Sequence, residues 1–236
     1  HIVVDNCSDD ATHDVLEKYP EIIAVIESDR GQSEALNKGF QKARGDWILW
    51  LNIDDFLCPG VMSRYLELVI DQGENFDMAY GHTVFVDADS RKIRTVFHPR
   101  WYYWMTKIGC YVAPSTGSLF RRSCLVENPL DESFHMVMDT EWMLRVGETL
   151  RVRRLAMEAV SFRLDDNKTA DHIQSGILTP QHQKERNLLA TQYPYYPGED
   201  EPLGMIGNFF IWGLRKLTRL LILTDKFVCR SFSSSR

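Results

Sequence analysis

The sequence predicts an α/β protein in which helices flank a mostly parallel sheet. Two observations predict this class. Apolar, β-branched runs alternate with segments of helical periodicity, and this strand and helix unit occurs three times in succession along the first part of the chain. A hairpin pattern further on adds antiparallel strands. In such folds ligands bind beyond the carboxyl ends of the strands, so the residues that follow each strand are the first candidates for chemistry.

The first two units lie before residue 46. Ile2 to Asp5 is a β-branched run, and the polar residues NCSDDAT after it suit the start of a helix over about residues 10–18. A second strand is expected over residues 22–27 and a second helix over residues 33–43, ending at Gly45.

The third unit begins with a strand over residues 47–51, and Pro59-Gly60 opens its helix. Further strands are expected over residues 76–80 and in a hairpin formed by TVFVDADSRKIRTV. VMDTEWMLRVGE, residues 137–148, predicts a helix with Met138, Trp142 and Val146 on one stripe. The aromatic-rich residues 97–111 fit either a flap of the core or a groove wall for a ring-shaped ligand.

The composition indicates one main globular domain. The 236 residues are 44% apolar and 25% charged, which is enough for one sizeable core. The five cysteines are scattered and lack CxxC spacing, so neither a disulfide framework nor a zinc site is expected, and a reducing cytoplasm fits best. His1-Ile-Val-Val-Asp opens directly as a strand, so no signal peptide is expected at the start.

The charge is unevenly distributed. The net charge is −6, yet from Leu203 to the end six cations face one acid. An acidic body argues against a nucleic-acid-binding surface. Prolines, a glycine and three acids mark a linker over residues 194–203, so we expect a main domain over 1–193 and a basic tail over 204–236.

Cations interrupt the apolar residues of this tail, which argues against a transmembrane helix. Two alternatives remain, an amphipathic helix that lies in a membrane interface and a C-terminal helix that docks on its own domain.

Two adjacent carboxylates, Asp54 and Asp55, follow the strand in WILWLNIDDFLCPG. Like charges so close repel, so either a cation lies beside them or they form a solvated turn or helix cap. Carboxylate oxygens are the ligands that Mg²⁺ and Mn²⁺ prefer, and such a metal completes its shell with substrate phosphates and water. The position at a strand end therefore predicts a metal site for a diphosphate substrate.

Several blocks in the same order resemble family 2 glycosyltransferases. IVVDNCSDDAT is similar to that family's VVDDGSTDGT segment, and SDRGQSEALNKGFQKARGDWILWLNIDD resembles its DxGxxxALNxGxxxAxGxxxxxLNxDD block. PSTGSLFRRSCL, VMDTEWMLRV and FRLDDNKTA resemble three later segments, of which the second is the family's acidic helix. The match covers about residues 1 to 170.

The resemblance implies a GT-A fold with a Rossmann-like sheet. It also implies an inverting transfer of a sugar from a UDP-, GDP- or dTDP-linked donor to a glycan or lipid-linked acceptor, with Mg²⁺ or Mn²⁺ as cofactor. The tail would then keep the protein peripheral, on the cytoplasmic face of the membrane. Two alternatives are a non-catalytic sugar-nucleotide-binding protein that retains the fold and a nucleotidyltransferase.

The resemblance also assigns roles to individual residues. Asp139 matches the catalytic base, and it begins a helix, where its carboxylate can face the cleft. Glu141 is the fallback base. The other matches are Asp54 and Asp55 to the metal and the donor diphosphate, Asn52 to the ribose, Asp5 to the nucleobase, and Arg30 and Gln32 to the donor-side loop.

The sequence departs from the family in three places. The strand and helix that precede the first block in the family are not seen ahead of His1. Asn52 replaces the first carboxylate of the DxDD pattern, and its amide can hydrogen-bond a ribose but does not help to bind a cation. Asp165 stands where the family often has a histidine that completes the metal shell, and its oxygens suit Mg²⁺ or Mn²⁺.

Overall fold

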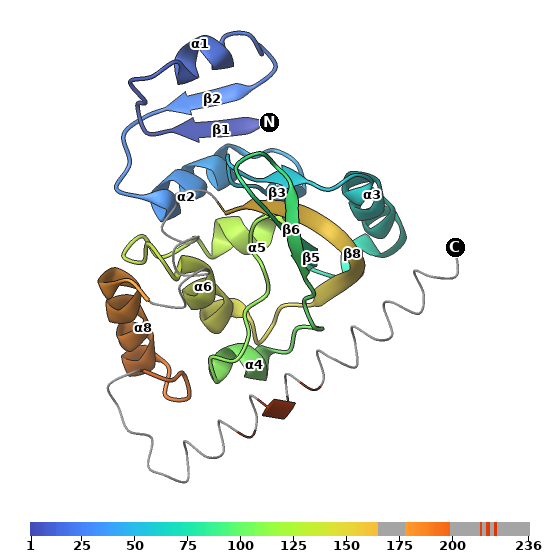
Figure 1. Ribbon diagram of the computed structural model, residues 1–236, viewed down its shortest axis with the longest axis vertical. Helices are drawn as coiled ribbons and strands as arrows, with labels where there is room; N and C mark the ends of the chain where they lie inside the picture. The colour runs from blue at the N-terminus through green and yellow to red at the C-terminus, as the bar shows by residue number, and fades with distance from the viewer. Residues whose placement is uncertain (165–177, 199–212, 214–215, 218–219, 221–236) are drawn as a thin grey trace.

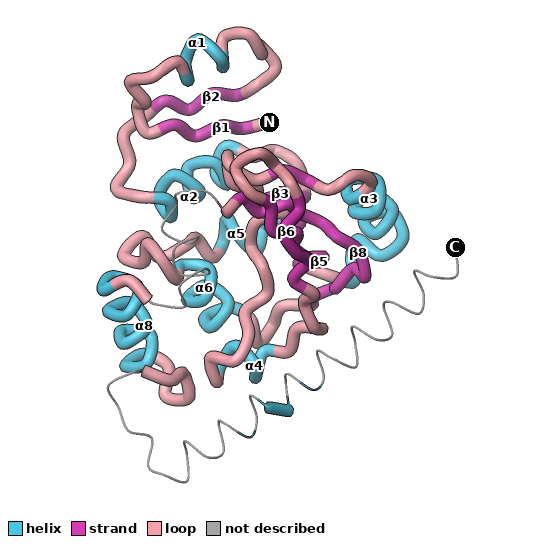
Figure 2. The backbone as a smooth tube through the Cα atoms, viewed as in Figure 1, coloured by secondary structure: helices cyan, strands magenta, loops and turns pink. Residues whose placement is uncertain are grey.

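The computed structural model describes residues 1–164, 178–198, 213, 216, 217 and 220 (Figure 1). Strands and helices alternate along the first part of the chain, and the strands form two separate sheets (Figure 2). The predicted α/β class is therefore confirmed.

The smaller sheet lies at one end of the molecule (Figure 1). It contains β1 (Ile2–Asp5) and β2 (Ile23–Ile26), which are joined through α1 (Thr12–Leu16) and pair in parallel. The following helix, α2 (Gln32–Lys42), packs against β1. Each of these elements lies within three residues of its predicted bounds, because each depends on local periodicity.

The larger sheet carries the candidate site. Its strands are β3 (Trp47–Trp50), β4 (Phe56–Leu57), β5 (Met78–Val86), β6 (Lys92–Val96), β7 (Ser118–Arg121) and β8 (Val152–Arg163). They are ordered β3-β7-β5-β8-β4, and β6 pairs with β5.

The pairing within this sheet corrects the prediction of a mostly parallel arrangement. β5 and β8 are parallel, whereas the other four pairs in the described residues are antiparallel. β3 lies antiparallel to β7 and does not pair with β1 or β2. The reason is that β7 inserts between β3 and β5, and antiparallel neighbours need no crossover helix to connect them. Local periodicity holds no information on such long-range pairing.

Helices cover both faces of the larger sheet (Figure 1). On one face lies α3 (Val61–Gln72), which continues into the 3₁₀ turn η1 (Gly73–Asn75). The other face is covered by α5 (Arg122–Glu127) and α6 (Met138–Val146), with α4 (Tyr103–Lys107) and α8 (Pro180–Gln192) near α6. Side chains of β5 alternate between the two faces, so Met78 and Tyr80 enter the core beneath α6 while Ala79 packs beneath α3.

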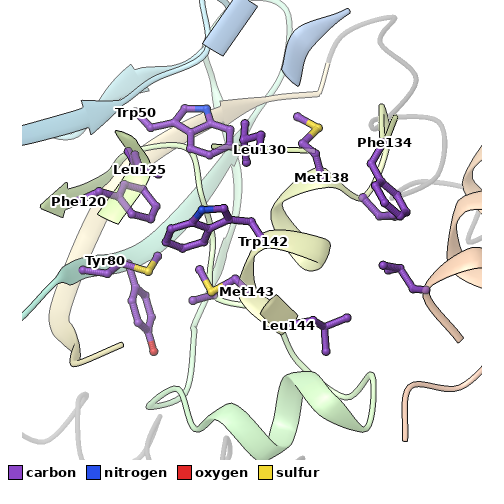
Figure 3. Packing of buried hydrophobic residues seen from close by; sticks show 14 of the residues in the cluster. Trp50, Tyr80, Phe120, Leu125, Leu130, Phe134, Met138, Trp142, Met143 and Leu144 are labelled. Carbon is purple, nitrogen blue, oxygen red and sulfur yellow. The ribbon is translucent and has the colours of Figure 1, made fainter. Parts of the chain in front are cut away.

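Trp142 lies at the centre of the core beneath α6 (Figure 3). Its ring meets Phe120 of β7 edge-on, with centroids 5.8 Å apart, and its indole N–H donates to the carbonyl of Asn128 at 2.7 Å. Met138 is also buried and Val146 packs against the same cluster, which confirms the predicted stripe. These contacts fix which face of α6 is buried, and so they also fix the orientation of its first residues.

The aromatic-rich residues 97–111 lie beside this core. Trp101 packs against it, and the Tyr80 hydroxyl donates to the carbonyl of Pro99 at 2.6 Å. These contacts favour the core flap, although His98 of the same stretch lines the pocket described below.

Some predictions fall outside the described residues. These are the role of Asp165, residues 199–203 of the predicted linker, and all of the tail over 204–236 except four positions. Tyr196, within the predicted linker, is buried in the core beneath α6. None of the helices in the described part of the chain is long and apolar enough to cross a bilayer.

Candidate active site

A tight turn follows β3 and presents the two adjacent aspartates. The N–H of Asp55 donates to the carbonyl of Asn52 at 3.2 Å, which closes the turn. Asp54 is exposed, whereas Asp55 is only 7% exposed. The pair therefore divides into one solvent-facing carboxylate and one that lies against the protein.

The buried carboxylate of Asp55 is held by two donors from distant segments. The Thr116 hydroxyl donates to it at 2.8 Å and the N–H of Arg163 at 3.2 Å. Burial, together with the nearby charge of Asp54, raises the pKa of Asp55 to about 6, although both hydrogen bonds act in the opposite direction. The guanidinium of Arg163, the last residue of β8, donates to the carbonyls of Asp54 and Ala88, at 3.2 and 2.6 Å, and so helps to fix the turn.

Ser115 and Thr116, just ahead of β7, join the aspartate turn to α6. The Thr116 hydroxyl accepts from the Asn52 N–H at 3.3 Å while it donates to Asp55. The Ser115 hydroxyl donates to the Asp139 carboxylate at 3.2 Å. We call these two residues the Ser115–Thr116 bridge, because adjacent hydroxyls hold Asp55 and Asp139, which are far apart in the sequence.

Gly117 fixes the position of this bridge. Its N–H donates to the carbonyl of Trp50 at 2.7 Å, and its carbonyl accepts from the Tyr65 hydroxyl at 2.8 Å. Its φ of +72° is a left-handed conformation, and a Cβ at this position would lie 2.3 Å from Cβ of Val160. Only glycine fits here, since any side chain would meet both the φ penalty and the Val160 side chain of β8.

Asp139 lies in the first turn of α6 and is half-buried. Besides Ser115, its carboxylate accepts from the N–H of Thr140 at 2.7 Å. Burial raises the pKa of Asp139 above its ordinary value, and these hydrogen bonds only partly offset the effect. A carboxylate with a raised pKa is a better proton acceptor for a hydroxyl than a solvated one.

Asp139 lines a pocket of about 170 Å³. The lining combines apolar side chains, two phenylalanines among them, with side chains that carry hydroxyl, imidazole and carboxyl groups. Its lining residues are Thr83, Phe85, Val96, His98, Pro114, Ser115, Thr116, Asp139 and Phe162. Both members of the Ser115–Thr116 bridge line this pocket. A ligand in it would therefore lie beside Asp139 and close to Thr116, which donates to Asp55.

The fallback base, Glu141, is not available to this pocket. It is 3% exposed and accepts from the Arg145 guanidinium at 2.8 and 3.0 Å. The Tyr193 hydroxyl donates to the same carboxylate at 3.1 Å. Its carboxylate therefore joins α6 to the segment after α8.

The residues predicted for the donor side are only partly brought together. The Gln32 amide donates to the Asn52 side-chain oxygen at 3.2 Å, so these two lie at the aspartate turn. Arg30 is exposed and pairs with Glu34 at 2.7 Å and with Glu132. The structure thus places Gln32 and Asn52 at one site, while the Arg30 guanidinium is engaged with acids beside it.

Asp5 ends β1, in the smaller sheet. It is 8% exposed and is held by the N–H of Ser8 at 2.9 Å and by the His13 ring at 3.1 Å. The hydrogen bonds from Ser8 hold the pKa of Asp5 below its ordinary value. It is an ionised acceptor at the carboxyl end of a strand, where a carboxylate can accept a hydrogen bond from a ligand.

The described residues hold no group of three or more His, Cys, Asp or Glu side chains able to bind a metal ion. The aspartate turn nevertheless fits Mg²⁺ or Mn²⁺, because these ions use one or two protein carboxylates together with substrate phosphates and water. The exposed carboxylate of Asp54, next to the buried one of Asp55, is the chemistry that such an ion prefers.

Sequence reasoning missed Ser115, Thr116 and the backbone N–H of Arg163. PSTGSLFRRSCL was noted as a block, but small hydroxyl residues before a strand carry no local sign of what they bond. Their role follows from tertiary contacts alone.

The glycosyl transferase family 2 model matches residues 1–126, more than half of the chain. An uncharacterized glycosyltransferase, YwdF of Bacillus subtilis, is 28% identical over 183 residues, which are 72% of this chain and 66% of that protein. The succinoglycan biosynthesis protein ExoO of Rhizobium meliloti is 32% identical over 39% of this chain and 27% of its own length. The chain therefore spans less than two thirds of these relatives.

Two solved structures are similar in fold. S. aureus TarS 1-349 in complex with UDP-GlcNAc has a TM-score of 0.61 at 16% identity, covering 81% of this chain and 56% of that one. Mannosyltransferase PcManGT from Pyrobaculum calidifontis, in complex with GDP-Man and Mn²⁺, has a TM-score of 0.57 at 14% identity, covering 98% of this chain and 65% of that one. These likenesses confirm the predicted GT-A fold.

Proposed function

The chain belongs to glycosyl transferase family 2, and we propose that it transfers a sugar from a nucleotide-diphosphate sugar to a hydroxyl acceptor, with inversion at the anomeric carbon. The observation that carries the proposal is the Ser115–Thr116 bridge, which connects Asp55 and Asp139. An inverting transfer needs a base at the attacking hydroxyl and neutralisation of charge at the leaving diphosphate. The bridge brings the two carboxylates that would meet these requirements, Asp139 and Asp55, to one site.

The donor side is formed by the aspartate turn. Asp54 and Asp55 would hold Mg²⁺ or Mn²⁺, which when bound neutralises the charge that develops on the departing nucleoside diphosphate. Asn52 and Gln32, which hydrogen-bond each other, supply amide groups for the ribose, and Asp5 accepts from the nucleobase. Arg30 is proposed to belong to the donor-side loop that precedes α2. Nucleotide sugars in complexes of similar fold, UDP-GlcNAc in TarS and GDP-Man in PcManGT, support this class of donor.

The acceptor side is formed by the pocket beside Asp139. The carboxylate takes the proton from the attacking hydroxyl as the new glycosidic bond forms, and its raised pKa favours this transfer. Phe85 and Phe162 offer apolar faces against which a sugar ring can pack, while Thr83 and His98 offer polar atoms for its hydroxyl groups.

Surface polysaccharide or lipid-linked glycan synthesis is the proposed setting. The names of two relatives support it, because ExoO is a succinoglycan biosynthesis protein and TuaG of Bacillus subtilis is a putative teichuronic acid biosynthesis glycosyltransferase. The basic tail over residues 204–236 is proposed to bind the cytoplasmic surface of a membrane, where anionic headgroups attract cations.

The test is a donor panel with purified protein and Mn²⁺. We expect release of nucleoside diphosphate from one of the UDP-, GDP- or dTDP-sugars in the presence of a glycan or lipid-linked acceptor. NMR of the first-formed product then gives the anomeric configuration, and retention would refute the inverting mechanism. Pyrophosphate release would indicate a nucleotidyltransferase instead. Donor binding by calorimetry without any turnover would indicate a non-catalytic sugar-nucleotide-binding protein.

A further inference from the structure

The backbone that leads into α6 is held by a side chain from another helix. Glu185 of α8 is 3% exposed, and its carboxylate accepts from three consecutive backbone N–H groups, those of His135, Met136 and Val137. The nitrogen to oxygen distances are 3.1, 2.7 and 3.2 Å respectively. The Gln181 side-chain amide donates a further bond at 2.5 Å. A buried carboxylate is costly unless it is hydrogen-bonded, and these donors meet that need.

The three N–H groups lie at the start of the helix that carries the candidate base. Val137 directly precedes α6, and its apolar side chain makes no capping hydrogen bond. Glu185 instead accepts from the N–H of this N-cap residue and of the two residues before it. Consecutive N–H groups form a concavity that binds anions, and negative charge is favoured near a helix N-terminus. We call this arrangement the Glu185 clamp.

The clamp bears on Asp139 through the backbone. Asp139 follows Val137 by two residues, and its carboxylate reaches Ser115 at 3.2 Å only while the start of α6 keeps its place. Glu185 is not among the residues that line the pocket, so it has no direct contact with a ligand there. A displacement of about 1 Å at a reacting group can lower a rate by a factor of roughly 10².

We propose that Glu185 is a positioning residue for the sugar transfer, which holds the start of α6 so that Asp139 faces the pocket. The inference rests on the proposed function. Glu185 and the backbone it holds both lie beyond residue 126, where the match to the family model ends. The clamp therefore lies outside the segment that the family model matches.

The variant Glu185→Gln tests the clamp with little change of volume. It replaces one acceptor oxygen by a donor NH₂, which cannot accept from the backbone, and it removes the negative charge. In the full-length protein we expect kcat to fall at least tenfold, with the donor KM and the calorimetric donor Kd within twofold of wild type. Hydrogen exchange of the amides of residues 135–139 should become at least tenfold faster.

Tyr193→Phe is the matched control. It removes another polar bond to α6, that of the hydroxyl of Tyr193, just after α8, to the Glu141 side chain at 3.1 Å, which does not involve the backbone of residues 135–137. We expect its Tm to fall while kcat and the exchange of residues 135–139 stay within twofold of wild type.

Three outcomes overturn the proposal: Glu185→Gln retains kcat within twofold, its exchange at residues 135–139 is unchanged, or Tyr193→Phe loses kcat to the same extent. Wild-type protein without turnover refutes the proposed function instead. In that case exchange alone decides whether Glu185 holds residues 135–139: faster exchange supports the clamp, and unchanged exchange overturns it.

Discussion

Thr116→Val is the substitution that isolates the Ser115–Thr116 bridge. Valine has nearly the shape of threonine, so the change exchanges the hydroxyl for a methyl group and leaves the packing almost intact. Thr116 is 7% exposed, so water does not readily replace the lost group. The change removes the donor to Asp55 at 2.8 Å and the acceptor of the Asn52 N–H at 3.3 Å.

The magnitude follows from these two bonds. A hydrogen bond to a charged group contributes about 1.5–3 kcal/mol, and an ordinary one about 1 kcal/mol. Oδ2 of Asp55 would lose the Thr116 donor, whereas the Arg163 N–H donates to the other oxygen, Oδ1. We therefore expect the free energy of unfolding at neutral pH to fall by about 3 kcal/mol, which for a chain of this size lowers Tm by roughly 6–12 °C.

Urea denaturation and calorimetry of the metal-free protein measure this loss, and Thr116→Ser is the control because it keeps the hydroxyl. The serine variant should lose no more than about 1 kcal/mol, from its missing methyl group. The assay of sugar transfer should show a lower kcat for valine than for serine. Equal stability of the valine variant and wild type would refute the bridge as a support of Asp55.

Three further substitutions test the site. Asp139→Asn should lower kcat by a factor of about 10²–10⁴, and it should raise Tm at neutral pH. A half-buried acid with a raised pKa binds its proton more tightly in the folded state, so its contribution to stability falls as pH rises above the ordinary value of 3.8. Because a protonated Asp139 cannot act as the base, kcat/KM of the wild type should fall as pH is lowered through that raised pKa. Asp54→Ala should abolish the stimulation by Mn²⁺ that EDTA removes from wild type, and a variant that keeps this stimulation would exclude Asp54 as a ligand. Gly117→Ala should prevent folding or cost more than about 4 kcal/mol, because it combines a left-handed φ with a clash against Val160; a stable, active variant would contradict the close approach of β8.

Local elements could be predicted from the sequence, but the order of the strands could not. The strand over residues 47–50 and the helix over 138–146 follow from apolar periodicity, which is a local property. The four residues of β7 carry no such pattern, and they decide that β3 pairs antiparallel rather than with β1 or β2. Pairing depends on contacts between residues far apart in the chain, so local reasoning defaulted to the parallel arrangement.

The candidate site shows the same division. Asp54 and Asp55 could be selected because they follow a strand, and Asp139 could be selected because its segment resembles the acidic helix of the family. The hydroxyls that join them, on Ser115 and Thr116, could not, because a serine and a threonine in a loop are ordinary turn residues. Burial likewise separates Asp54 from Asp55, two neighbours that look equivalent in the sequence.

A comparison with Asp77 distinguishes Asp55 and Asp139 from a buried carboxylate that is held by ion pairs. Asp77, at 8% exposure, is about as buried as Asp55, yet it pairs with Arg151 at 2.7 Å and with Arg121 at 3.3 Å, and these bonds hold its pKa below the ordinary value. Asp55 and Asp139 are held instead by hydroxyl and backbone N–H groups, which are neutral, so burial raises the pKa of each. A buried acid whose charge the protein itself does not neutralise is destabilising, and it is tolerated where a ligand can compensate it. A cation beside Asp55 and a hydroxyl proton at Asp139 would supply that compensation, and both are requirements of an inverting sugar transfer.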